Sequence, residues 1–490
     1  MTTKQELKQY QNFINGQLMS ASSGNTMDSI EPSTGEAWAK IPLSQQEDVE
    51  TVVAAARQAF PAWSALSAEE RSGYLRRIGD SISLHDEELT TLETRDNGEV
   101  IAVAPYLAEA IKSVWYDAAG ACKDGSQGKT VQMGPTSIGY TLREPFGVVV
   151  GILPWNAPLF TFTIKAAYAL AAGNTVIIKP SQQASVSSLR YGELLGKILP
   201  PGVLNVISGL GRDIGDALVA NRGVNKVSMT GSGTTAGAIL RASAPHPKPA
   251  IFELGGKSPN IVFEDADLDK AVDGVIHGIY TSNAGQRCTA GSRILIQRSI
   301  FNEMINRIAE RIKSTISVGD PMDLKNTMGP LSSLDQYEKI RSYIELGLEE
   351  GGEIVCGGRH GGETILPDKP ELSGGYWVEP TLFKVNSNSL RICQEEIFGP
   401  VAVVMPFETE EEAAAIANDT CFGLGAGVWT RNLNLAHRMI RKIESGNVWV
   451  NTYSRVGADL PFGGFKESGY GTDSILEYSR EKACVIEIGE

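Results

Sequence analysis

The sequence is poor in the patterns that mark several protein classes. Its six cysteines include no Cys-x-x-Cys pair and its five histidines show no His-Glu-x-x-His spacing, so we expect no zinc site, disulfide framework or catalytic metal. The most apolar stretch, residues 146–155, is too short to span a bilayer. No apolar core of a signal peptide follows Met1–Glu6. These absences predict a protein of the cytoplasm with reduced thiols and no membrane partner.

An excess of positive charge is also missing, because the formal net charge is −14. Phosphate-bearing surfaces do not attract an acidic protein, so nucleic acid is not expected as a partner, and any anionic ligand must be held by local groups. The remaining composition, 42% hydrophobic and 21% charged, is ordinary for a globular protein. With 490 residues, the chain exceeds the size of a single hydrophobic core, which predicts two or three domains.

Short β-branched runs alternate with longer helical patterns between residues 146 and 254, as is typical of a parallel sheet built from βαβ units. A second such region runs from 261 to about 451. Together they predict an α/β fold with two doubly wound, Rossmann-like domains. Strands are expected at 147–153, 175–179, 203–207, 226–229, 293–297 and 401–405, and helices at 161–172, 185–199, 215–220 and 235–242.

Five separated motifs, in one order along the chain, resemble the aldehyde dehydrogenase superfamily. Each alone is only suggestive, but their joint occurrence at family spacing makes chance a negligible explanation. They are Pro154-Trp-Asn-Ala-Pro158, Phe252-Glu-Leu-Gly-Gly-Lys-Ser-Pro259, Gly285-Gln-Arg-Cys-Thr-Ala-Gly-Ser-Arg293, Glu395-Glu-Ile-Phe-Gly-Pro400 and Pro461-Phe-Gly-Gly-Phe-Lys-Glu-Ser-Gly469.

The resemblance implies a cofactor-binding domain over 1–124 and 145–254 and a catalytic domain over 255–450. Two remote strand-like segments, 130–141 and 483–488, suit a small β oligomerisation arm, which we assign to 125–144 and 470–490. A homodimer or homotetramer is therefore expected.

The resemblance also implies the chemistry, oxidation of a small-molecule aldehyde to its carboxylic acid with reduction of NAD(P). Cys288 matches the nucleophile that forms a thiohemiacetal, Asn156 the donor to its oxyanion, and Glu253 the base for hydrolysis of the following thioester. The alternatives are a cap on the helix that starts near Pro158 for Asn156, and a surface carboxylate at a strand end for Glu253. Asp473 occupies the place of a proton-relaying glutamate and is at best a helper.

NAD is the expected cofactor, and the residues that match its family contacts are Trp155, Lys179, Gln182, Gly231, Ser232, Glu396 and Phe398. The glycine-rich segment 209–215 has one residue too many before its third glycine for a dinucleotide fingerprint. The phosphate contact is therefore assigned to Thr230–Ser232, at the start of a helix. Many NAD-specific relatives have a glutamate where Gln182 stands; without its charge, NADP is predicted to be tolerated.

The residues that match the family's substrate-lining positions are Ala157, Thr161, Ile164, Arg287, Arg455 and Val456. Their small side chains predict a roomy tunnel. Arg287 fits an anionic aldehyde and a structural ion pair equally well. Two rival functions are an acylating dehydrogenase that uses coenzyme A, against which the presence of Glu253 speaks, and a binding protein that has lost activity, against which the retained Cys288, Asn156 and Glu253 speak.

Overall fold

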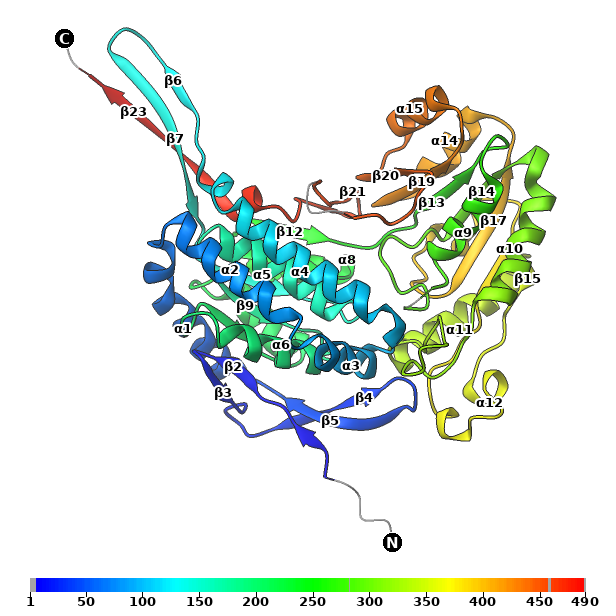
Figure 1. Ribbon diagram of the computed structural model, residues 1–490, viewed down its shortest axis with the longest axis horizontal. Coiled ribbons are helices and arrows are strands. Elements are labelled where there is room, and N and C mark those ends of the chain that lie inside the picture. Colours follow the sequence, from blue (N-terminus) through cyan, green and yellow to red (C-terminus); the bar gives the residue numbers. More distant parts are fainter. Residues whose placement is uncertain (1–5, 282, 457–459, 489–490) are drawn as a thin grey trace.

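The structure is a computed structural model that describes residues 6–281, 283–456 and 460–488. Two helix-covered sheets lie beside each other, and a narrow three-stranded sheet projects from the first of them (Figure 1). Within these residues no helix is long and apolar enough to cross a membrane. The expectation about a signal peptide refers partly to residues 1–5, and these lie outside the described residues.

The first sheet is mostly parallel and buried on both faces. Its strand order reverses between its third and fourth strands, which makes it doubly wound as expected. In spatial order it consists of β22 (Gly469–Tyr470), β12 (Ala250–Glu253), β11 (Lys226–Thr230), β8 (Val148–Ile152), β9 (Thr175–Lys179), β10 (Leu204–Val206), β2 (Asn12–Ile14) and β3 (Gln17–Met19). The strands from β12 to β10 are parallel.

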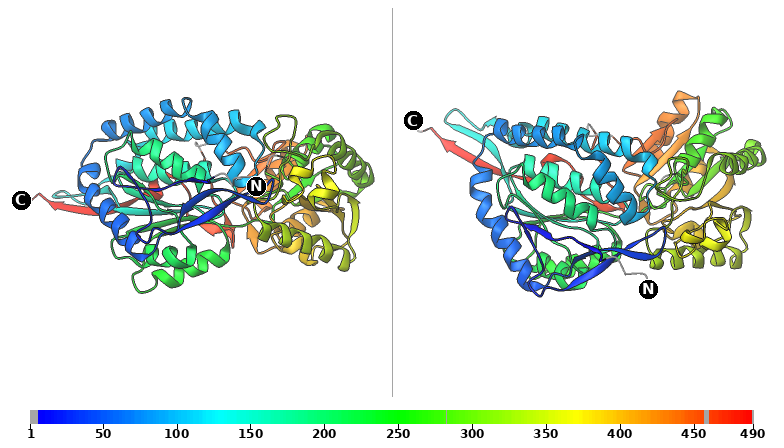
Figure 2. Two further views of the ribbon diagram at one scale, coloured as in Figure 1. Left: turned by 90° about the horizontal axis from the view of Figure 1, so that it is seen from below. Right: turned by 60° about the horizontal axis from the view of Figure 1, so that its bottom comes forward.

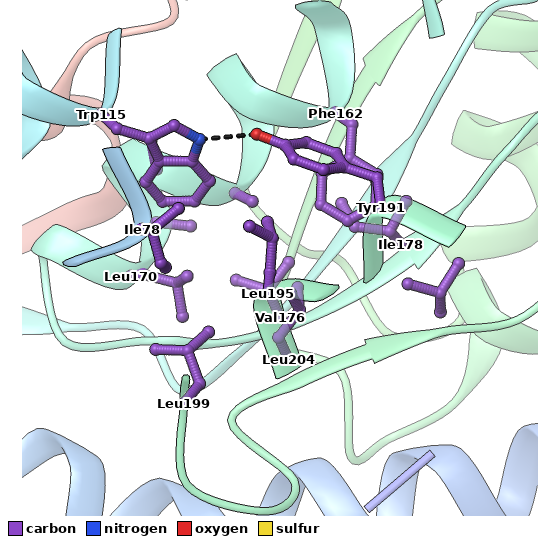
Figure 3. Packing of buried hydrophobic residues seen from close by; sticks show 14 of the residues in the cluster. Ile78, Trp115, Phe162, Leu170, Val176, Ile178, Tyr191, Leu195, Leu199 and Leu204 are labelled. Carbon is purple, nitrogen blue, oxygen red and sulfur yellow. Dashed lines mark hydrogen bonds between the residues drawn. The ribbon is translucent and has the colours of Figure 1, made fainter. Parts of the chain in front are cut away.

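Helices cover both faces of the first sheet (Figure 2). One face carries α5 (Pro158–Ala171) and α6 (Val186–Gly196), with α2 (Ala68–Ile82), α3 (Asp86–Asn97) and α4 (Ala104–Ala121) packed outside them. The other carries α1 (Gln46–Ser64), α7 (Asp216–Ala220) and α8 (Gly233–Ser243). Val149 of β8 packs on the face covered by α5 and α6, and Val148 and Val150 pack on the face covered by α1, α7 and α8, because side chains alternate across a strand. Between α4 and α6, the Trp115 indole N–H donates to the Tyr191 hydroxyl at 2.7 Å (Figure 3).

The second sheet is built in the same way. In spatial order its strands are β15 (Glu353–Cys356), β16 (Thr381–Lys384), β17 (Val401–Phe407), β14 (Arg293–Gln297), β13 (Pro259–Val262), β19 (Gly425–Trp429) and β20 (Asn447–Val450). Only β15 runs antiparallel to its neighbour. One face carries α9 (Leu268–His277) and α10 (Phe301–Thr315), and the other carries α11 (Leu334–Glu349), α14 (Glu410–Asn418) and α15 (Leu433–Lys442). Two short helices, α12 (Gly362–Ile365) and α13 (Arg391–Gln394), lie in its connections.

Three small sheets complete the fold. The first has the order β1 (Lys8–Gln9), β5 (Glu36–Pro42) and β4 (Thr26–Glu31), and the second pairs β18 (Phe422–Gly423) with β21 (Phe465–Lys466). The third is the projecting sheet, β23 (Ser479–Glu487), β7 (Ser137–Pro145) and β6 (Thr130–Gln132). Its strands include the two segments expected to be strand-like. Tyr470, which our boundaries place in the arm, pairs instead with Phe252 in the first sheet; the domain boundaries otherwise stay predictions.

Most expected elements are present, with shifted ends. The helix expected at 161–172 begins at Pro158, because proline is tolerated in the first turn of a helix. The helix expected at 185–199 already ends at Gly196. A π-helical turn, Gly211–Gly215, precedes α7. The helix expected at 235–242 is regular and begins two residues earlier, at Gly233.

Only Leu254–Ser258 separate β12 from β13, so the chain passes from the first sheet into the second without a long linker. The carboxyl end of a strand in one sheet thereby leads directly to the amino end of a strand in the other. The loops that follow β8 and β12 contact the loops that precede β14 and β17.

Candidate active site

The predicted site residues come from opposite edges of the two sheets. In the first sheet they stand at or just after the carboxyl ends of strands; in the second they stand before the amino ends. The first group is Trp155 and Asn156 after β8, Lys179 and Gln182 at and after β9, Gly231 and Ser232 after β11, and Glu253 at the end of β12. The second group is Cys288 before β14, and Glu396 and Phe398 before β17.

Two glycines in the crossing between the sheets allow these groups to come together. A Cβ atom on Gly256 would lie 2.3 Å from the carbonyl oxygen of Cys288, and one on Gly255 would lie 2.5 Å from Oε2 of Glu396. The Gly256 N–H also donates to Oε1 of Glu396 at 2.8 Å. A side chain at Gly256 would push the backbone of the Cys288 loop away, so this position requires glycine, whereas one at Gly255 would meet only the carboxyl end of the Glu396 side chain. The crossing therefore contacts the Cys288 loop and Glu396 directly.

Cys288 lies in the loop between α9 and β14 and is partly exposed. Burial of the sulfur, with the nearby carboxyl groups of Glu253 and Glu396, raises the pKa of the thiol to about 12. All three effects disfavour the thiolate. The side chain is therefore a thiol at neutral pH.

Glu253 is almost completely buried, with 4% of its surface exposed. Neither carboxyl oxygen has a hydrogen-bond partner among the described residues. Burial and, second, the carboxylate of Asp473 raise the pKa of Glu253 to about 9, an effect that Lys165 partly offsets. The alternative of a surface carboxylate is therefore wrong. A carboxyl group with a pKa of about 9 is mostly protonated at neutral pH, and it can take up and release a proton when its surroundings change.

The carboxylate of Asp473 accepts hydrogen bonds from groups other than Glu253. Its Oδ2 accepts from Nζ of Lys165 at 2.7 Å, and both side chains are buried. Its Oδ1 accepts from the Tyr478 hydroxyl at 3.0 Å, and that hydroxyl also lies 2.9 Å from Oγ of Ser228. Asp473 thus acts on Glu253 through its charge. Sequence reasoning missed Lys165, although a lysine within the apolar pattern of α5 was a usable signal.

Asn156 does not cap the helix that follows it. The N-cap position of α5 is Ala157, and no side chain caps it. The Asn156 side chain instead reaches the cysteine loop, where its Nδ2 donates to the carbonyl oxygen of Gln286 at 2.9 Å. The helix-cap alternative is therefore wrong. The amide of Asn156 contacts the backbone at Gln286, two residues before Cys288 in the sequence.

Two further amides bind the backbone of Asn156. Its carbonyl oxygen accepts from Nδ2 of Asn283 at 2.5 Å and from Nδ2 of Asn97 at 3.3 Å. Sequence reasoning identified neither of these residues as functional. Both lie far from Asn156 in the sequence and outside the five motifs, so no local pattern indicates the contact.

The groups expected to hold a dinucleotide contact other residues of the protein. Ser232 is the N-cap of α8 and accepts from the Thr235 N–H at 3.2 Å, which leaves the helix start directed at a possible anion. Trp155 and Phe398 contact edge to face, with ring centres 5.3 Å apart. Lys179 is buried, which lowers its pKa to about 8, and its amine donates to the carbonyl of Pro180.

Glu396 is the second carboxyl group of this region, and its burial raises its pKa. Gln182 accepts from the N–H of Gly211, at the start of the π-helical turn, over a long distance of 3.4 Å. A helix start, an amine, a carboxylate and an aromatic pair match the phosphate, hydroxyl and ring groups of a dinucleotide. The residues present therefore fit such a cofactor.

The candidate substrate residues fall into two groups. Ala157, Thr161 and Ile164 are half-buried on the first turns of α5, where the Thr161 hydroxyl donates to the Ala157 carbonyl at 2.7 Å. Arg455 and Val456 are exposed, and their loop contacts the cysteine loop through the hydroxyls of Thr289 and Ser454, 3.1 Å apart.

Arg287 is half-buried and directly precedes Cys288, and its charge helps to lower the pKa of His277 after the larger effect of burial. Arg287 therefore lies near the end of α9. Within the residues that the structure describes, no group of three or more His, Cys, Asp or Glu side chains is arranged to hold a metal ion.

Residues 18–486 match the model of the aldehyde dehydrogenase family. An aldehyde dehydrogenase of Vibrio cholerae serotype O1 is 42% identical over 475 residues, covering 95% of this chain and 91% of that protein. Acetaldehyde dehydrogenase 2 of Cupriavidus necator is 42% identical over 475 residues, covering 95% and 92%. A crystal structure of betaine aldehyde dehydrogenase from Staphylococcus aureus, in complex with NAD+, has a TM-score of 0.93 at 36% identity, covering 98% of this chain and 95% of that one.

Asp473→Asn should lower the pKa of Glu253 from its value of about 9. The variant removes a negative charge and leaves Lys165 uncompensated, and both changes favour the Glu253 carboxylate. The titration midpoint of Glu253 should then be lower than in the unaltered protein by about one pH unit or more. Infrared titration of the protonated carboxyl band gives the midpoint, and the band is assigned by its loss in Glu253→Gln. An unchanged midpoint in folded Asp473→Asn would show that the two carboxyl groups do not interact.

Proposed function

The chain belongs to the aldehyde dehydrogenase family, and we propose that Cys288, Asn156 and Glu253 carry out its oxidation of an aldehyde to the carboxylic acid. The observation that carries this assignment is the hydrogen bond from the Asn156 amide to the Gln286 carbonyl. It brings a neutral donor to the loop of the nucleophile, while the buried Glu253 is close enough to raise the pKa of the Cys288 thiol.

The first step is attack of the Cys288 sulfur on the aldehyde carbon. The sulfur–carbon bond forms, the thiol proton passes to solvent water, and the carbonyl oxygen becomes an oxyanion. The Asn156 amide has two hydrogens, of which one donates to Gln286, so the second can stabilise the oxyanion. The bound nicotinamide dinucleotide supplies the hydride acceptor, and loss of hydride from the thiohemiacetal leaves a thioester on Cys288.

The second step is hydrolysis of the thioester. Glu253 in its ionised form, the minor form at neutral pH because its pKa is raised to about 9, takes a proton from water as the water oxygen bonds to the acyl carbon. The carbon–sulfur bond then breaks, the acid departs, and the proton that Glu253 took is passed to the sulfur of Cys288. The burial of Glu253 supports this role over transfer to coenzyme A, because a base held inside the site can serve a small water molecule.

The cofactor assignment rests on the same geometry. We infer that Ser232, Gly231 and Trp155 contact the pyrophosphate, Lys179 and Gln182 the adenosine ribose, and Glu396 and Phe398 the nicotinamide riboside. The NAD+ complex of the Staphylococcus aureus neighbour supports NAD as the cofactor of this chain. Gln182 lacks the charge that would repel a 2′-phosphate, which supports additional use of NADP.

The assignments of the substrate site and of the cellular location are less specific than those of the catalytic residues. We infer that the aldehyde lies among Ala157, Thr161, Ile164, Arg287, Arg455 and Val456. The loops of Arg455 and Cys288 contact each other through the Thr289 and Ser454 hydroxyls, which supports this grouping. A cysteine nucleophile must stay reduced, which supports the cytoplasm as the working compartment.

We further infer that the projecting sheet joins copies of this chain into a homodimer or homotetramer. Its outer strand β23 has one hydrogen-bonding edge without a strand partner among the described residues. The sheet also exposes apolar side chains, at Val131, Leu142, Val485 and Ile486. A long apolar edge strand invites pairing with a second chain.

Glu253→Gln should release about one equivalent of NADH in a fast phase and then slow strongly, because the thioester forms but is not hydrolysed. The acyl group on Cys288 should be visible by mass spectrometry during turnover. Cys288→Ala is the control and should give neither NADH nor acyl adduct. A steady-state rate equal to that of the unaltered enzyme in Glu253→Gln would assign the base to another residue.

Gln182→Glu should raise the preference for NAD over NADP, measured as the ratio of kcat/KM values, by about tenfold, or ~1.4 kcal/mol. The new carboxylate would repel a 2′-phosphate and still accept hydrogen bonds from ribose hydroxyls. Gln183→Glu, one residue further on, is the matched control. If the ratio does not change in Gln182→Glu, the side chain does not face the adenosine ribose.

Val485→Lys should shift the solution mass toward smaller assemblies, because it places a charge on an edge strand where Val485 is 59% exposed. Light scattering coupled to size-exclusion chromatography measures the mass. Leu84→Lys alters an even more exposed apolar side chain outside the projecting sheet, at 78%, and should leave the mass unchanged. Equal masses for both variants would contradict assembly through the sheet.

A further inference from the structure

A network of buried amides surrounds Asn156. It consists of Asn97 at the end of α3 and of Asn283 and Gln286 in the loop before Cys288. Their exposed fractions are 0%, 3% and 0%. Buried amides are costly unless their hydrogen bonds are made, so the directions of these bonds carry information about what the network holds.

Asn156 is held at two points. Its backbone carbonyl accepts from Asn283 and Asn97, and its side-chain amide donates to the carbonyl of Gln286. No side chain caps α5 at Ala157. Side chains from other parts of the fold thus contribute to the orientation of Asn156.

Gln286 fixes the direction in which Asn283 donates. Its Nε2 donates to Oδ1 of Asn283 at 3.0 Å and to the Asn283 carbonyl at 3.1 Å. With its Oδ1 used as an acceptor, Asn283 must direct its Nδ2 elsewhere, and it points to Asn156. Oε1 of Gln286 in turn accepts from the N–H of Ser332 at 3.0 Å. A flip of either amide would break at least two hydrogen bonds at once.

We propose that Asn283 and Gln286 are positioning residues that hold the Asn156 amide in place for the oxyanion. The proposal rests on the function proposed above for Asn156. The network joins the loop after β8 of the first sheet to the loop before β14 of the second, so it sets the donor and the nucleophile relative to each other. Neutral amides do this without adding a charge beside Glu253 and Glu396.

The required precision explains why such a network is useful. An oxyanion donor acts within roughly 2.7–3.1 Å of the oxygen it stabilises, and misplacement by about 1 Å can cost on the order of 100-fold in rate. The carbonyl of Asn156 and its side chain are only a few bonds apart. A second hydrogen bond on the carbonyl therefore restricts where the amide can lie.

Asn283→Asp tests the proposal with almost no change in volume. The carboxylate can still accept from Gln286 but cannot donate to the Asn156 carbonyl. We expect the single-turnover rate of NADH formation to fall about 10- to 100-fold, with a smaller effect on the KM for NAD. Gln286→Glu, which keeps the acceptor for Ser332 and loses the donors to Asn283, should act in the same direction.

A double-mutant cycle separates positioning from general damage. In an Asn156→Ala background, Asn283→Asp should lower the rate by less than about threefold, because no amide remains to be misplaced. A full 10- to 100-fold loss in that background would overturn the proposal. A normal rate in Asn156→Ala alone would instead overturn the role of Asn156, so the two failures are distinguishable.

Asn205→Asp is the matched control. Asn205 is also buried, its Nδ2 donates to the Gly202 carbonyl at 2.8 Å, and its Oδ1 accepts from the Asn15 N–H. This variant should lower the melting temperature about as much as Asn283→Asp while leaving the rate of NADH formation within about twofold. Equal rate losses in both variants would also overturn the proposal.

Discussion

The close approach of the backbone at Gly255 and Gly256 to the Cys288 loop is the constraint on which the site depends. At this point the chain leaves the first sheet and enters the second, and the distances leave no room for a Cβ atom. The same peptide donates to Glu396. Cys288, Glu253 and Glu396 are therefore positioned by a single short crossing. Movement of one sheet relative to the other would disturb all three together.

The site combines buried acidic groups with neutral donors. Burial raises the pKa values of Cys288, Glu253 and Glu396 alike, so proton transfers accompany its chemistry. The buried amine of Lys165 is paired with Asp473. The Asn156 amide contacts the cysteine loop at the Gln286 carbonyl, so an oriented neutral donor lies at that loop.

Much of this could be predicted from the sequence. The strands of both sheets are covered on two sides and appear as short apolar runs, which is why β9 and β14 match their expected bounds. The two doubly wound domains, the family and the oxidation of an aldehyde are confirmed. The motifs also indicated Cys288, Glu253 and Asn156, whose catalytic roles stay predictions.

The remaining features depend on long-range geometry that no local pattern encodes. Asn283 and Asn156 are 127 residues apart, and their contact follows from how the two sheets are placed. Asp473 was expected to help Glu253, yet its carboxylate is bound by Lys165, 308 residues away. The usual rule places ligands at the carboxyl ends of parallel strands, but in the second sheet the site residues precede the amino ends. The short crossing from β12 to β13 accounts for that exception.

The pairing of β7 with β23 has a consequence for the order in which the protein is made. Arg143 and its cross-strand partner Glu481 are 338 residues apart. At about 5–20 residues per second, roughly 17–70 s pass on the ribosome before β7 can meet β23. During that interval β7 has only β6 beside it, and β12 still lacks its neighbour β22. The nascent chain therefore carries open strand edges until β22 and β23 emerge, and such edges are templates for pairing with other chains.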